Sequence, residues 1–113
     1  MKAALIIGHN ERQPGALALE PIGKAEYPFY LDVVSTRQPD DAPGVKLAIV
    51  TREYTGSYHQ EIRKAYQQVD QWGADISVEL HFNGASSTAT GTETLCNGTT
   101  ESRRLAGAMQ SSM

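Results

Sequence analysis

The apolar residues along the chain follow two patterns, which predict two kinds of secondary structure. Short runs of apolar, often branched residues, each closed by glycine or a polar residue, predict buried strands. Segments with an apolar residue at every third or fourth position predict amphipathic helices. The predicted strands cover residues 3–7, 45–50, 76–81 and 91–95. The predicted helices cover about residues 26–38, residues 57–73 and a last segment that begins at Thr99–Thr100 and carries Leu105, Ala108 and Met109.

Residues at the ends of these segments support the same assignment of strands, helices and loops. Gly73 follows the most regular helical pattern and is expected to stop that helix. Residues 11–25 carry two prolines and two glycines without a clear period, which predicts a loop. The segment 39–44 (PDDAPG) is typical of a turn that ends a helix. Strands therefore alternate with helices, which favours an α/β fold with a mostly parallel, twisted sheet and helices on both faces, in three layers.

Two histidines occupy equivalent places in this predicted sheet. His81 ends the run ADISVELHFNG (residues 74–84), and His9 follows the first strand directly after Gly8. Parallel strands end at the same edge of a sheet, and open α/β sheets bind their ligands at that edge. We therefore expect the two histidines to face each other there. Glu26 opens the first predicted helix, and the loop before it is long enough to bring its carboxylate alongside them.

Two imidazoles and one carboxylate form a three-ligand set of the catalytic zinc type, which leaves a fourth position for water. Such a metal polarises a carbonyl and activates water, which suits the hydrolysis of an amide. The residue types leave a second interpretation open, in which the three polar residues are unrelated and separately satisfied. Their spacing is not a compact motif such as HExxH. His59, the third histidine, lies on the helix predicted at 57–73 and is expected to face solvent.

Length, charge and cysteine content narrow the class of protein. The chain has 113 residues, which predicts one domain over 1–113. A net charge of −3 without a cluster of basic residues gives no reason to expect nucleic acid. The single cysteine, Cys96, rules out an internal disulfide, and we expect it to be a small buried residue near a strand end. Only five apolar residues precede Gly8, too few for a signal peptide or a membrane span.

Several of these segments, taken in order, resemble a known family. They are GHN after the first strand, E-x-x-x-Y-L at the first helix, VTR after the second strand, then GADISVELHFNG and GTETL. From Leu5 to about Met109 the chain resembles the zinc-dependent N-acetylmuramoyl-L-alanine amidases of the amidase-3 family. These are peptidoglycan hydrolases found among bacterial cell-wall enzymes and phage endolysins. The resemblance implies a phosphorylase/hydrolase-like amidase fold and cleavage of the amide between N-acetylmuramic acid and L-alanine.

The resemblance also implies a set of site residues. The zinc ligands would be His9, Glu26 and His81, with Glu20 as the competing choice for the middle ligand. Glu26 fits better because Leu31 follows it at the place of the family's Asn-Leu pair, although Tyr30 stands where the family has asparagine. The family places substrate-groove residues at positions that correspond here to Asn83 and the segment 91–94, which includes Gly91 and Glu93. Arg52 and Glu93 are expected to hold loops in place.

Two departures from the family pattern concern carboxylates. Glu79 stands where the family usually has serine, on the same side of its strand as His81. It is a candidate catalytic base or a partner of that histidine, and a carboxylate on the outer side of the sheet is the alternative interpretation. The family's catalytic glutamate comes from a strand that would lie beyond Met113. The resemblance thus implies a domain without its last strand or strands, with an exposed sheet edge through which copies of the chain would associate.

The sequence leaves three functions open. The first is a zinc amidase acting on peptidoglycan; the second is a non-catalytic remnant that binds zinc and peptidoglycan without cleaving it. The third is a metal-free α/β domain that binds a partner. The absence of a signal peptide suits synthesis in the cytoplasm followed by action at the cell wall, as in phage lysis, or a domain of a longer exported protein.

Overall fold

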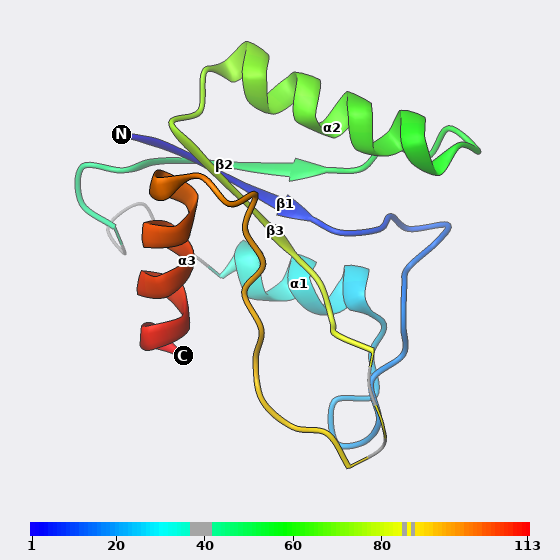
Figure 1. The fold of residues 1–113 in the computed structure, drawn as a ribbon. Coiled ribbons are helices and arrows are strands. Elements are labelled where there is room, and N and C mark those ends of the chain that lie inside the picture. Colours follow the sequence, from blue (N-terminus) through cyan, green and yellow to red (C-terminus); the bar gives the residue numbers. More distant parts are fainter. Residues whose placement is uncertain (37–41, 85, 87) are drawn as a thin grey trace. The chain divides into compact units, whose positions relative to one another are not determined.

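The computed structural model describes residues 1–36, 42–84, 86 and 88–113, which form two compact units, Met1–Phe82 and Asn83–Met113. The first unit alternates strands and helices, and the second contains one helix (Figure 1). The elements in chain order are β1 (Lys2–Ile7), α1 (Glu26–Ser35), β2 (Lys46–Thr51), α2 (Tyr58–Trp72), β3 (Ile76–Leu80) and α3 (Thr100–Ser112). The α/β class is confirmed, whereas a single domain over 1–113 stays a prediction.

The sheet of the first unit is parallel, with β1 in the centre and the order β2-β1-β3. Helices α1 and α2 lie on opposite sides of this sheet (Figure 1). Alternate residues of a strand point to opposite faces, so β1 contributes to both sides of the sheet. Its residues Ala4 and Ile6 join the buried cluster that includes Ala65 and Val69 of α2. The central strand is apolar on both faces because a helix covers each of them.

The ends of the helices follow the predicted signals. Gly73 caps α2 in the left-handed conformation with a φ of 73°, which glycine adopts without steric cost. Thr99 caps α3, and its side chain accepts a hydrogen bond from the backbone N–H of Ser102. Helix α1 ends at Ser35. The last two residues predicted for it, 37–38, and the first part of the predicted turn at 39–44 lie outside the described residues.

The second unit corrects two predictions. Residues 91–95 do not form a strand, although their alternating pattern predicted one. Within this unit, Thr92 and Thr94 instead make hydrogen bonds to Gln110 of α3. A β-branched sequence becomes a strand only when another strand supplies its backbone partners. Without that strand, Cys96 does not lie beside a buried strand end, and it is exposed rather than buried.

Among the helices of the described residues, none has the length and apolar character needed to cross a membrane.

Candidate metal centre

The parallel sheet brings the two predicted histidines to the same edge. Ile7, the last residue of β1, is in register with Leu80, the last residue of β3. The parallel pairing of these two strands continues for one more residue, because the Gly8 N–H donates to the Leu80 carbonyl at 3.1 Å. His9 and His81 follow directly, and their ring centroids lie 5.1 Å apart in an edge-to-face arrangement.

Glu26, the first residue of α1, completes the group. Its Oε2 lies 3.2 Å from His9 Nε2 and 3.2 Å from His81 Nδ1. One ligand atom from each of the three residues lies within 4.8 Å of the others. The Glu26 side chain is only 6 % exposed, whereas those of His9 and His81 are 24 % and 35 % exposed. Solvent therefore reaches the group from the side of the two histidines, whereas the Glu26 carboxylate is buried.

The surroundings of Glu26 keep its carboxylate ionised. Burial alone would raise its pKa, but the backbone N–H groups of Ala16 and Phe82 donate to its two oxygens at 3.0 and 3.1 Å. With the neighbouring histidines, these bonds lower the pKa of Glu26 below its ordinary value. A charged carboxylate beside two imidazoles is a suitable donor set for a divalent cation.

His9 is held by its backbone and by the turn that follows it. Its φ is 67°, a left-handed conformation that is uncommon outside glycine. The next residue, Asn10, is buried, and its side-chain oxygen accepts hydrogen bonds from two backbone N–H groups of the turn. Its amide donates to the buried Glu61 of α2 at 3.1 Å. Glu61 also accepts from the Thr55 N–H at 2.9 Å, so α2 anchors the segment that carries His9.

His81 is held by Tyr30 of α1 and by a hydrogen-bonded group of side chains centred on Glu79 of β3. The Tyr30 hydroxyl of α1 donates to the His81 carbonyl at 2.7 Å. The Nε2 atom of His81 lies 3.0 Å from Oε1 of Glu79, which is also hydrogen bonded to the buried Arg52. The hydroxyl of Tyr66 in α2 donates to the other Glu79 oxygen at 3.0 Å. Glu79 is therefore an internal partner of His81, and its interpretation as a carboxylate on the outer side of the sheet is wrong.

The side chains around Glu79 favour the ionised form of its carboxylate. Burial alone would raise its pKa, but the hydrogen bonds from His81 and Arg52 outweigh that effect and lower the pKa to about 2. The same hydrogen bond to Glu79 raises the pKa of His81. Burial and the Glu79 charge raise the pKa of Tyr66 to about 12, so its hydroxyl remains a donor at neutral pH.

Two glycines leave room for the imidazole rings. A Cβ at Gly8 would lie 2.2 Å from Cε1 of His81, and a Cβ at Gly15 would lie 2.6 Å from Cδ2 of His9. Each glycine therefore allows a histidine ring to lie directly against the backbone. The sequence interpretation did not assign these roles. The only signal available was the presence of Gly8 directly before His9 at the end of an apolar run.

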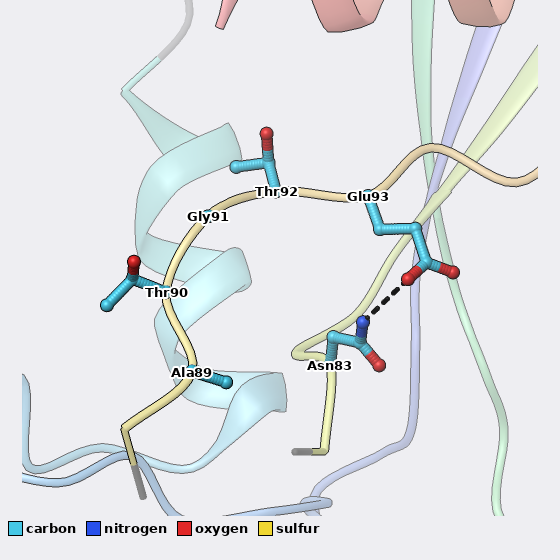
Figure 2. Close-up of a pocket in the computed structure, with 6 residues that line it drawn as sticks. All are labelled: Asn83, Ala89, Thr90, Gly91, Thr92 and Glu93. Carbon is cyan, nitrogen blue, oxygen red and sulfur yellow. Dashed lines mark hydrogen bonds between the residues drawn. The ribbon is translucent and has the colours of Figure 1, made fainter. Parts of the chain in front are cut away.

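The remaining predicted residues lie elsewhere. Glu20, the competing middle ligand, is exposed and does not belong to the three-residue group. Asn83, Gly91 and Glu93 line a small pocket of about 160 Å³ within the second unit. Figure 2 shows the hydrogen bond of 3.0 Å between the Asn83 amide and the Glu93 carboxylate at one end of this pocket. His59 is exposed on α2, as predicted.

Sequence reasoning also missed the buried carboxylate of Glu61 and the polar role of Tyr66, because both lie in the helical pattern of α2. Their partners, Asn10 and Glu79, come from segments distant in sequence, so no local pattern could have indicated these contacts.

Comparison with known proteins identifies the family. The model of the family Amidase_3, N-acetylmuramoyl-L-alanine amidase, matches residues 4–113. Comparisons with curated proteins and with solved structures found no match. Since the family match covers nearly the whole chain, this protein belongs to the Amidase_3 family of N-acetylmuramoyl-L-alanine amidases, hydrolases that act on peptidoglycan.

Proposed function

We propose that this protein is a zinc-dependent amidase that cleaves the bond between N-acetylmuramic acid and L-alanine in peptidoglycan. The observation that carries the proposal is the convergence of His9, Glu26 and His81 at the carboxyl ends of β1 and β3. Family membership supports the substrate, because the matched family is named for this amide. The site of action would be the bacterial cell wall.

The donor set fits zinc by its chemistry. Two imidazole nitrogens and one carboxylate oxygen are ligands of catalytic zinc sites, which keep one position free. His9 would use Nε2 and His81 would use Nδ1, the atoms that face Glu26. When bound, zinc acts as a Lewis acid on the scissile carbonyl and lowers the pKa of water. Tyr30 would keep the end of β3 in place through the His81 carbonyl.

The substrate would also contact polar groups of the second unit. We assign Asn83, Gly91 and Glu93 to this role because they line one pocket. An amide and a carboxylate match the hydroxyl and amide groups of a muropeptide.

Metal content and bond cleavage test the proposal together. We expect about one zinc per chain by elemental analysis of the wild type, and almost none in His81→Ala. His59→Ala removes an exposed histidine and is the matched control, so it should bind zinc like the wild type. Purified peptidoglycan incubated with the wild type should release new amino termini of alanine. Absence of zinc in the wild type after reconstitution would refute the proposal.

Retention of zinc without release of amino termini would refute the catalytic part. In that case the protein would be a peptidoglycan-binding module. A binding assay with insoluble peptidoglycan would identify it as one. The observation that favours this second candidate is that both Glu79 oxygens are engaged by other side chains. A carboxylate whose pKa is lowered to about 2 by these hydrogen bonds would be a weak base toward water.

A further inference from the structure

We propose that Glu79 is a positioning residue, which holds the proton of His81 on Nε2 and leaves the Nδ1 lone pair directed at the metal position. This inference rests on the proposed zinc site. It differs from the catalytic role considered for Glu79 in the sequence, because it assigns no contact between Glu79 and substrate.

Two carboxylates, those of Glu26 and Glu79, contact the imidazole ring of His81. Glu79 Oε1 lies 3.0 Å from His81 Nε2, and Glu26 Oε2 lies 3.2 Å from Nδ1. A neutral imidazole has one N–H, so it can donate to only one of them. Donation to Glu79 leaves the Nδ1 lone pair free, and donation to Glu26 would block it. Metal-ligating histidines commonly donate their other N–H to a carboxylate, which fixes the ring and the tautomer.

Two further side chains fix the orientation of Glu79. Arg52, whose side chain is 3 % exposed, is paired with Oε1, and the Tyr66 hydroxyl donates to Oε2 at 3.0 Å. The carboxylate is therefore held by groups from the end of β2 and from α2. Because Oε1 faces both Arg52 and His81 Nε2, this oxygen is the fixed acceptor for the imidazole.

The same geometry predicts what happens without Glu79. Arg52 Nη2 lies 3.5 Å from His81 Nε2 and would then be its nearest partner. A guanidinium only donates, so it would require a lone pair on Nε2. Glu26 would accept the proton at Nδ1. Both remaining neighbours thus favour the tautomer with the proton on Nδ1, which cannot bind a metal through that atom.

The test uses the full chain and reads the proton position directly. Nitrogen-15 NMR of the zinc-free protein, at a pH where His81 is neutral, should show the proton on Nε2 in the wild type. In E79A the proton should move to Nδ1. Zinc affinity, measured by competition with a chromophoric chelator, should fall by about 10- to 100-fold. E53A is the matched control, because Glu53 is exposed and its nearest cation is 3.6 Å away.

Two conservative variants keep the test valid if E79A does not fold. In E79Q the amide oxygen can still accept from His81 and Arg52, so the proton should stay on Nε2. Y66F removes only the bond to Oε2, so it should weaken zinc binding less than E79A does. A proton on Nδ1 in the wild type or in E79Q would overturn the inference. It would also be overturned if E79A kept the Nε2 proton or if, with zinc bound by the wild type, E79A bound it as tightly as E53A.

The outcomes separate this inference from the proposed function. If the wild type binds no zinc but E79A still moves the proton, the zinc site fails and the orientation of His81 by Glu79 stands. If the wild type binds zinc and E79A behaves like the wild type, the zinc site stands and the role of Glu79 fails.

Discussion

Replacement of Gly8 by alanine tests whether close packing of His81 against the backbone shapes the metal centre. Gly8 has no left-handed backbone conformation, so alanine would cause no backbone strain there. The added Cβ would, however, lie 2.2 Å from Cε1 of His81 and 2.6 Å from both ring nitrogens. The effect of Gly8→Ala is therefore a direct steric conflict with the ring of one candidate ligand.

The size of the conflict follows from contact distances. Carbon atoms in contact lie about 3.5 Å apart, so the ring must move by about 1.3 Å from its position 2.2 Å from the new Cβ. Metal–ligand distances tolerate changes of about 0.2 Å, so this movement takes Nδ1 out of range. We expect zinc affinity to fall by about 10- to 100-fold or more. Overpacking should lower the free energy of unfolding by about 1–3 kcal/mol.

Gly107→Ala in α3 is the matched control, because a Cβ there meets no atom within 4 Å. Alanine is favoured over glycine inside a helix by about 0.5–1 kcal/mol, so this variant should be at least as stable as the wild type. Its zinc affinity should be unchanged. Chelator competition gives the affinities, and denaturant unfolding of the zinc-free proteins gives the stabilities.

Wild-type zinc affinity together with a wild-type denaturant midpoint in Gly8→Ala would contradict the role assigned to Gly8. That result would mean that the His81 ring does not need the space above Gly8. A loss of stability with unchanged affinity would refute the steric link between this glycine and the metal centre.

Three further predictions concern the buried polar groups and the metal. Glu61→Gln should lower the free energy of unfolding by about 1–3 kcal/mol, because the 1 % exposed carboxylate accepts from two donors and an amide would face one of them. The exposed Glu53→Gln should change it by less than about 0.5 kcal/mol in the same denaturant titration, and equal effects would contradict the prediction. Tyr66 should titrate near pH 12 instead of 10.0, as followed by carbon-13 NMR of its ring, and Glu79→Ala should bring its pKa back toward the ordinary value. Because the folded-state pKa is raised, the contribution of Tyr66 to stability is present below pH 10 and lost as the pH rises toward 12. Removal of zinc with a chelator should lower the melting temperature by about 10 °C when free zinc had been at about 100 times its dissociation constant, and His81→Ala should show no such shift.

The amino-acid sequence determined the parts of the structure that depend on local patterns. The apolar runs that form β1, β2 and β3 and the periodic segment that forms α2 were predicted within one or two residues. The reason is that burial of one face or one run of residues depends on spacing along the chain. The parallel sheet then followed from the alternation of strands and helices. It places His9 and His81 at one edge, so their proximity was also predictable.

Contacts between distant segments were decided only by the tertiary structure. The sequence left Glu20 and Glu26 as alternatives, and the fold brings the carboxylate of Glu26 to the histidines. The sequence left several roles open for Glu79. In the fold its carboxylate contacts Arg52, directly after β2, Tyr66 of α2 and His81. The segment 91–95 has the composition of a strand and is not one. Strand pairing, ring packing and buried hydrogen bonds each need a second group from elsewhere in the chain, and no local pattern specifies that group.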